Sequence, residues 1–363
     1  MTSSAYGAYI HIPFCVHRCG YCAFATWSDR HHLEADYLDA LRVDIGRAVA
    51  AGMPQVSSIF VGGGTPSLVS PDRLAAVIAS VPRHEGAEIT VECNPDDVSA
   101  ELLDEFCRAG VNRISLGVQS TIPHVLASLD RTHDVENVQT AVDCIRSAGI
   151  RSFNLDLIYG TAGESVEEWR ECLGELLSYD PPHISAYALT VEPGTPLSDQ
   201  HDRHPDDDDQ ADKYVIADEM LSAKGLSNYE VSNWARPGHE CQHNLLYWQQ
   251  GNYRGFGCAA HSHENGRRWW NVRTPDRYIT MVGDGADVEA ASEELDVETR
   301  AFERLELQLR LREGVPRAAL NGDLLDGLVE LVNDRWVLTR HGRLMANDIS
   351  TRLIISPTVA QDG

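Results

Sequence analysis

Residues 9–22 read YIHIPFCVHRCGYC, an apolar strand-like run followed by a loop with three cysteines. Cysteine thiolates are soft ligands that select zinc, Cu(I) or iron–sulfur clusters. A structural zinc site normally has four ligands, and a [4Fe–4S] cube normally takes four cysteines. The spacing C-x3-C-x2-C offers three and no second pair follows, although a histidine of the same stretch leaves zinc open as an alternative. We predict a [4Fe–4S] cluster on Cys15, Cys19 and Cys22, with one iron open to a chelating small molecule.

The other six cysteines are scattered, and the total of nine is odd. The first residues, MTSSAYGAYIHIPF, lack the basic segment and apolar core of a signal peptide. This pattern indicates a reducing compartment rather than a disulfide framework. No apolar run reaches the roughly 20 residues that a membrane span needs. We therefore expect a cytoplasmic protein.

The charge balance is strongly acidic, with a net charge of −25. Only Lys213 and Lys224 among the 30 basic residues are lysines, and Asp206 to Asp209 form a run of acid. Because phosphate backbones are bound by clustered Lys and Arg, this composition argues against a general nucleic-acid surface. We expect no nucleic-acid partner.

Short strand-like runs alternate with amphipathic helical patterns up to about residue 200. Six strand-then-helix units in series predict an α/β fold with a parallel sheet and right-handed crossovers. The expected strands are Ala8–Ile12, Ser58–Val61, Ile89–Glu92, Arg113–Val118, Ser152–Leu157 and Ile184–Leu189. The expected helices are Glu34–Ala51, Pro71–Val81, Ala100–Ala109, Val135–Ala148 and Ser165–Tyr179.

Polar residues or glycines stand at the end of every expected strand. The cysteines follow the first strand, and the sequence GGGTP (62–66) follows the second. The next four strands end at Glu92, Gln119, Asp156 and Thr190. In (β/α) barrels the carboxyl ends of the strands meet at one mouth, where the active site lies. We therefore predict a partial (β/α)6 barrel over residues 1–225 with these groups converging at its mouth.

The remainder of the chain changes in character after residue 225. Residues 226–290 are expected to form a connecting segment rich in His and aromatic residues, and residues 225–270 within this part of the chain are expected to be loop-rich and dense in His, Trp, Tyr and Asn. Residues 291–363 are expected to form a small, mainly α, winged-helix-like domain with a structural or docking role. Its expected elements are the helices Thr299–Arg312 and Leu320–Val332, the strand Trp336–Thr339 and the helix His341–Ile354.

Nearly the whole chain resembles the HemN/HemW branch of the radical S-adenosylmethionine (SAM) proteins. The matching stretches include YIHIPFC (9–15), GGGTPS (62–67), ISLGVQS (114–120), LDRTHD (129–134), NLDLIYG (154–160) and GFGCAAHS (255–262). The resemblance implies that SAM binds the open iron and can be cleaved by an electron from the cluster. It assigns SAM contacts to Tyr9, Gly63, Gly64, Thr65, Glu92, Gln119, Arg131 and Asp156, and places Tyr21 against the bound SAM. Thr190 and His261 also fall at positions that contact SAM in this branch.

The branch holds an enzyme and a heme carrier, and several residues discriminate between them. The enzyme, oxygen-independent coproporphyrinogen III dehydrogenase, has a fourth cysteine two residues after the third, where this chain has Phe24. It also carries roughly fifty more residues before its first cysteine. The stretch HNLLYW (243–248) is similar to the HNxxYW heme motif of the carriers, whereas Ala23 replaces an Asp common among them.

The resemblance therefore implies a heme chaperone that binds heme and transfers it to acceptor hemoproteins. His243 is the candidate iron ligand, with Cys241 as an alternative donor. Without the resemblance, a histidine that ties a loop to the backbone is the better interpretation of His243. The cluster and SAM would act as a structural or redox switch, and a homodimer is one option. Coproporphyrinogen dehydrogenase is the alternative function, and a zinc-stabilised barrel is the third.

Overall fold

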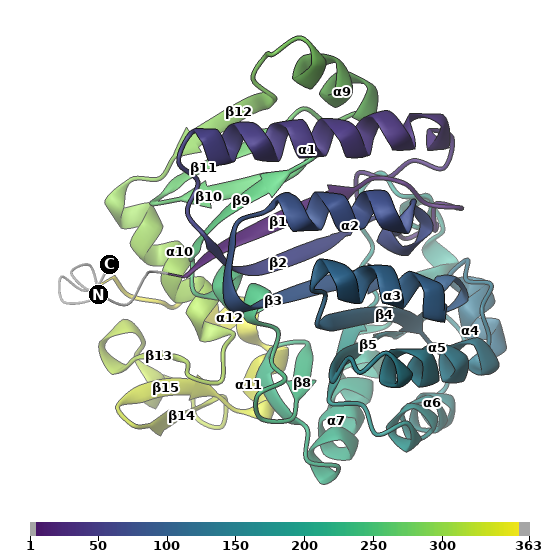
Figure 1. Ribbon diagram of the computed structural model, residues 1–363. Helices are drawn as coiled ribbons and strands as arrows, with labels where there is room; N and C mark the ends of the chain where they lie inside the picture. The colour runs from purple at the N-terminus through teal and green to yellow at the C-terminus, as the bar shows by residue number, and fades with distance from the viewer. Residues whose placement is uncertain (1–4, 356–363) are drawn as a thin grey trace.

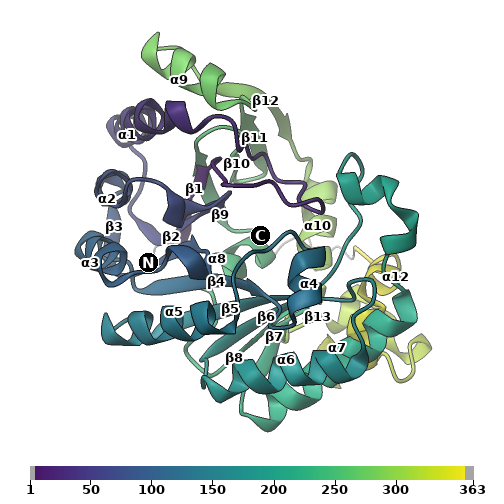
Figure 2. The ribbon, with the colours of Figure 1, turned by 90° about the vertical axis from the view of Figure 1, so that its right-hand side faces the viewer.

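The computed structural model describes residues 5–355 and confirms the α/β class predicted from the alternating pattern. In this part of the chain, the strands of the first half form a parallel series from β1 to β6. The strands are β1 Tyr6–Ile12, β2 Val56–Gly63, β3 Arg83–Cys93, β4 Arg113–Gln119, β5 Ser152–Tyr159 and β6 His183–Ala188. The sheet curves, and the helices of this half lie on its outer side, except for the short helix Pro123–Ser128, α4, which lies toward the mouth (Figure 2).

The helices of the first half follow the strands as predicted. They are α1 Glu34–Ala50, α2 Pro71–Ser80, α3 Ala100–Ala109, α4 Pro123–Ser128, α5 Val135–Ser147, α6 Val166–Ser178 and α7 Asp207–Ala223. Local signals explain where they begin and end. The Ser165 hydroxyl accepts from the N–H of Glu168 while the Glu168 side chain accepts from the N–H of Ser165, a capping box that starts α6. Gly110, with a φ of 92°, ends α3 in the left-handed conformation that glycine adopts readily.

The segment expected to be loop-rich extends the same sheet at both edges, so that expectation is wrong. β7 Ser227–Glu230 and β8 Asn233–Ala235 pair antiparallel beside β6. On the other edge β9 Asn252–Phe256 pairs parallel with β1, and β10 His261–Glu264, β11 Arg267–Asn271 and β12 Glu289–Glu294 follow antiparallel. Within residues 5–355 this makes one sheet of twelve strands. These strands are short and rich in Asn, Trp and charged residues, so they lack the long periodic pattern that identifies strands in the first half.

Helix α8 (Gln242–Trp248) joins the two edges of the sheet. It packs against β1 and β2. Helix α9 (Pro275–Gly283) packs on α1 (Figure 1). Gly7 of β1 makes the first contact possible, because a methyl group there would lie 2.6 Å from a Leu246 side-chain carbon. The segment that carries the HNxxYW sequence is thus fixed against the sheet. The predicted domain limits at residues 225 and 290 stay predictions, and β12 runs across the second one.

The C-terminal region combines helices with a small antiparallel sheet. Its helices are α10 Val297–Leu309, α11 Arg340–Leu344 and α12 Ala346–Ser350, and its strands are β13 Val315–Pro316, β14 Val329–Val332 and β15 Arg335–Leu338. The predicted helix Leu320–Val332 is wrong, because β14 occupies its end and pairs with β15. Asn333 and Asp334, both with positive φ, form the two-residue turn between these strands. The predicted helix His341–Ile354 is replaced by two short helices.

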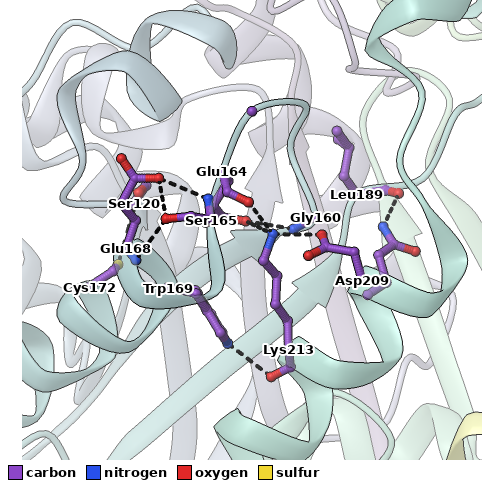
Figure 3. Close-up of polar contacts among 12 residues, drawn as sticks. Ser120, Gly160, Glu164, Ser165, Glu168, Trp169, Cys172, Leu189, Asp209 and Lys213 are labelled. Atoms are coloured by element: carbon purple, nitrogen blue, oxygen red, sulfur yellow. Dashed lines mark hydrogen bonds and ion pairs between the residues drawn. The ribbon is translucent and has the colours of Figure 1, made fainter.

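A buried ion cluster connects the loop after β5 to α7. The Lys213 ammonium has no solvent exposure and lies 3.2 Å from a carboxylate oxygen of Glu164, which is equally buried (Figure 3). The same ammonium donates to the Glu164 carbonyl oxygen at 2.6 Å and pairs with Asp209 at 2.6 Å. The Glu164 carboxylate also accepts a hydrogen bond from the backbone N–H of Gly160. These bonds hold the loop after β5 in one conformation.

Candidate functional site

The three cysteines of the CxxxCxxC stretch lie in the loop after β1, and all are partly exposed free thiols. Backbone bonds fix this loop, among them Cys15 N–H to the Trp27 carbonyl at 3.1 Å. The register of β1 on β2 pairs Ile12 with Gly63 and so brings the glycine-rich stretch beside the cysteines. A methyl group at Gly64 would lie 2.6 Å from the Phe14 carbonyl oxygen and 3.0 Å from the Cys15 sulfur. Glycine is required there because the two loops touch.

Burial dominates the electrostatics of two of the cysteines. Burial raises the pKa of Cys15, which a hydrogen bond with Thr65 partly offsets. Burial also raises the pKa of Cys19, and the nearby Arg131 guanidinium lowers it. Thiolates form at such positions when a metal compensates their charge.

The placement of the cysteines bears on the zinc alternative. Within residues 5–355, no group of three or more His, Cys, Asp or Glu side chains is placed to hold a single metal ion. A tetrahedral zinc site needs its ligand atoms about 2.0–2.3 Å from one ion. In an iron–sulfur cluster the thiolates each bind a different iron. Three free thiols in one loop are a donor set of the kind that such clusters use.

A pocket with a volume of about 540 Å³ opens in front of the cysteines. The residues predicted at the strand ends converge on it, as barrel topology requires. Its wall includes Cys15, Cys19, Cys22, Tyr21, Gly63, Gly64, Thr65, Glu92, Gln119, Arg131, Asp156 and Thr190. Tyr9, His243 and His261 do not line it. The structure thus gathers nine of the eleven positions that the resemblance assigns to SAM around the three cysteines, and Tyr9 and His261 are the two that do not line this pocket.

Two carboxylates lie deep in this pocket. Glu92 accepts from the N–H of Gly63 at 3.0 Å, and burial together with the charge of Asp156 raises its pKa to about 7. Asp156 accepts from Ser115 at 2.7 Å and from Asn154 at 2.7 Å, and burial raises its pKa as well. Both carboxylates keep oxygen lone pairs available as acceptors for ligand hydroxyls.

Other polar groups are held by the loops after β3 and β4. Arg131 donates to the Asn94 side-chain oxygen at 2.7 Å and to the Gly117 carbonyl at 2.8 Å. Gln119 follows a register irregularity between β4 and β5 and has a φ of 63°, a conformation rare outside glycine. Such backbone outliers concentrate at functional sites.

Asp130 is a site residue that sequence reasoning missed. It also has a positive φ, of 54°, and its carboxylate accepts from the N–H of Gly20 at 2.7 Å, between the second and third cysteines. The LDRTHD stretch contained it, but a surface aspartate gives no signal without the contact across 110 residues of sequence.

His243 is buried, with no exposed surface, and both of its ring nitrogens have partners. Nδ1 is 2.9 Å from the Ser58 hydroxyl of β2, and Nε2 is 2.8 Å from the Tyr247 hydroxyl. The ring stacks on Phe60 at 5.5 Å, and burial lowers its pKa to about 3. In this conformation His243 offers no nitrogen to a ligand. Its assignment to heme stays a prediction that requires α8 to move.

Two further cavities border the cysteine-lined pocket. One, of about 240 Å³, lies among polar residues that include Arg113, His183 and Cys241. The other has a volume of about 460 Å³ and is lined partly by aromatic side chains. Phe24, which is 67% exposed and stands at the fourth-cysteine position, lines all three.

Comparisons with known proteins agree with this geometry. The model of the Radical SAM superfamily matches residues 9–176. The chain is 40% identical to the heme chaperone HemW of Mycobacterium tuberculosis (strain H37Rv), over 98% of this chain and 96% of that protein. It is 37% identical to the heme chaperone HemW of Escherichia coli (strain K12), over 94% and 96%.

A solved structure shares the fold. Coproporphyrinogen III oxidase (HemN) from Escherichia coli, a radical SAM enzyme, superimposes with a TM-score of 0.83 over 96% of this chain and 89% of that one. The two sequences are 22% identical, so the likeness concerns the fold alone.

Proposed function

Because this chain belongs to the HemW family of radical SAM proteins, we propose that it is a heme chaperone. It binds heme and passes it to acceptor hemoproteins while it carries a [4Fe–4S] cluster with bound SAM. The observation that carries the proposal is the full-length similarity to HemW proteins together with a pocket that joins three free cysteines to the strand-end polar groups. This arrangement provides both cluster ligands and a nucleotide site.

The residues present fit the two cofactors. Cys15, Cys19 and Cys22 would hold the cluster, which when bound supplies an electron-transfer centre with one iron open to SAM. Gly63 and Gly64 line the pocket and let the glycine-rich loop touch β1 and the cysteine loop, because a methyl group at either position would collide with protein atoms there. Glu92 and Asp156 are acceptors for ribose hydroxyls, and Arg131 is a donor for a carboxylate. Tyr9, Tyr21, Thr65 and Gln119 are the remaining proposed SAM contacts.

Phe24 favours the chaperone over the dehydrogenase. Phe24 replaces the fourth cysteine of the dehydrogenase motif, and this exposed phenylalanine presents an apolar surface to all three cavities. A flat, largely apolar macrocycle is the kind of ligand that such a surface suits.

Heme titration under anaerobic conditions tests the proposal. The full chain, with and without cluster and SAM, is titrated with heme and then mixed with an apo-hemoprotein. We expect saturable binding and transfer, and no protoporphyrinogen from coproporphyrinogen III. Absence of heme binding, or steady formation of protoporphyrinogen with reduced protein and SAM, would overturn it.

We place this exchange in the reducing cytoplasm, because all nine cysteines lie in the described residues and none forms a disulfide. Among residues 5–355, no helix is both long and apolar enough to cross a membrane. A homodimer that forms only with cluster and SAM belongs to the same proposal, and light scattering of the apo and loaded protein tests it.

A further inference from the structure

The cavity of about 460 Å³ beside Phe24 is separate from the cysteine-lined pocket and shares with it only Ala23 and Phe24. Its volume lies in the range of cofactor sites, about 300–1,000 Å³. None of the cluster cysteines lines it. It therefore offers room for a second ligand next to the proposed cluster and SAM.

The HNxxYW stretch contributes to this cavity through Tyr247 rather than through His243. Tyr247 lines the cavity together with Tyr253, and the two rings meet edge to face with centroids 4.4 Å apart. The bond from His243 Nε2 to the Tyr247 hydroxyl fixes the first of these rings. Phe24 and Tyr9, the latter also a proposed SAM contact, add two more aromatic rings. The cavity has an aromatic wall whose orientation the buried histidine sets.

Two histidines line the cavity, and they differ in their free nitrogens. His11 is buried, with Nδ1 at 3.0 Å from the Tyr9 hydroxyl and Nε2 at 2.9 Å from the Ala25 carbonyl. His261 is exposed and stacks on Trp270 at 5.6 Å, and neither of its ring nitrogens has a hydrogen-bond partner within residues 5–355. Burial and the nearby Arg268 lower the pKa of His261. Burial thus favours the neutral ring, which has a lone pair available for a metal.

Arg273, which also lines the cavity, is exposed and has no ion pair or hydrogen bond with any group of residues 5–355. Such a guanidinium is notable in a chain with a net charge of −25. Guanidinium groups bind carboxylates through paired, charge-assisted hydrogen bonds. A ligand of this cavity is thus expected to carry a carboxylate as well as a flat apolar surface.

We propose that this cavity is the heme site: His261 ligates the iron, Phe24, Tyr247 and Tyr253 contact the macrocycle, and Arg273 pairs with a propionate. The inference rests on the proposed heme-chaperone function and deepens it by locating the ligand. His243 becomes a positioning residue that acts through Tyr247. In this site the heme would lie beside Phe24, and Phe24 would separate the heme from the cysteine-lined pocket.

Heme titration of matched variants tests this site. Full-length His261→Ala and Arg273→Gln are compared with His84→Ala and Arg277→Gln, which change an exposed histidine and an exposed arginine outside the cavity. Binding is followed by the Soret absorbance and the ligation state by EPR. We expect His261→Ala to lose the histidine-ligated spectrum and at least about tenfold in affinity, and Arg273→Gln to lose about tenfold. Both controls should bind as the wild type does.

Two further measurements separate ligation from positioning. Free imidazole should restore the histidine-ligated spectrum to His261→Ala, because it replaces the missing ligand. His243→Phe should bind heme more weakly and yet keep that spectrum. Loss of the spectrum in His243→Phe, with retention in His261→Ala, would assign the iron to His243 and overturn the inference.

The outcomes also distinguish this inference from the function on which it rests. If the wild type binds no heme, both fail. If the wild type binds heme and His261→Ala has the same affinity and spectrum, the site is wrong while the chaperone function stands. If His261→Ala loses SAM binding and keeps heme binding, the cavity belongs to SAM and the inference is overturned.

Discussion

The loops after β1 and β5 both bring ionisable groups into half-buried or buried positions, but they differ in how those groups are partnered. After β5, Glu164 meets Lys213 and the N–H of Gly160, and Asp209 completes the ion cluster (Figure 3). After β1, the thiols of Cys15 and Cys19 face a pocket of about 540 Å³ with raised pKa values.

The difference separates two uses of buried polar groups. A cluster whose opposite charges lie within contact distance of one another stabilises a loop by compensating its own charge, although one Glu164 oxygen stays buried without a partner. A set of donors directed into an open pocket needs a ligand to compensate its charge. The second pattern marks the binding site, although both lie at carboxyl ends of strands in one sheet.

The largest expected effect concerns the three cysteines that face the pocket. Cys15→Ser, Cys19→Ser and Cys22→Ser should each abolish cluster binding almost completely, because a cube with one iron already open has no ligand to spare. Iron and sulfide analysis after anaerobic reconstitution measures this. Cys107→Ser, a partly exposed cysteine of α3, is the control and should retain the cluster. If any of the three variants kept its full iron–sulfur cluster content, the loop after β1 would not differ from the loop after β5 in needing a ligand.

Removal of the Lys213 ammonium from the ion cluster should lower the stability of the fold and leave cofactor binding unchanged. Lys213→Met is expected to lower the free energy of unfolding by about 3–5 kcal/mol, because it leaves the buried Glu164 carboxylate without its counter-charge. Urea denaturation measures the change, with Lys224→Met, the other lysine, as the exposed control. The double variant Lys213→Met/Glu164→Gln should regain part of the loss. A loss no larger than that of Lys224→Met would contradict this account.

The pH dependence of stability tests whether Glu92, a pocket carboxylate, is left uncompensated in the absence of a ligand. Burial and the charge of Asp156 raise its pKa from 4.5 to about 7 in the folded chain. A carboxyl whose folded pKa is raised stabilises the fold below its unfolded pKa and loses that contribution as pH rises through the folded value. The apo protein should therefore lose on the order of 3 kcal/mol from this group between pH 4.5 and pH 7.

The variant Glu92→Gln should lack this loss and should bind SAM poorly. Denaturation at pH 5 and pH 8 measures the first effect, and SAM titration of reconstituted protein measures the second. Glu85→Gln, an exposed position of the same strand, is the control. Equal pH dependence in the wild type and Glu92→Gln would show that no ligand is needed to compensate this carboxylate.

The smallest expected effect concerns the loop after β5, where it leads into α6. Ser165→Ala removes the hydroxyl of the α6 capping box and should cost about 1 kcal/mol of stability while leaving cluster content unchanged. Ser222→Ala, an exposed serine near the end of α7, is the control for urea denaturation. A loss as large as that of Lys213→Met would mean that the cap, and not the ion cluster, holds this loop.

The sequence predicted the first half of the fold well and the second half poorly. The strands and helices from β1 to α6 are long and strongly periodic, so their burial pattern is visible in the residues. The helix predicted over Leu320–Val332 is wrong because Gly322 and Gly327 interrupt the helical pattern and the Asn333-Asp334 turn directs the chain into a hairpin. The short strands β7 to β12 are stabilised by pairing with β1 and β6, contacts that local propensity does not contain.

By itself the sequence determined the chemistry that is available: three thiols in one loop, glycines after the second strand and carboxylates at strand ends, because spacing and strand order fix which side chains share the barrel mouth. Only the tertiary structure decided which histidine has a free nitrogen. His243 is satisfied by Ser58, 185 residues away in sequence, whereas His261 is left open on the edge of the aromatic cavity. Hydrogen-bond partners of a buried ring come from distant strands, so no reading of the motif alone separates a ligand from a positioning residue.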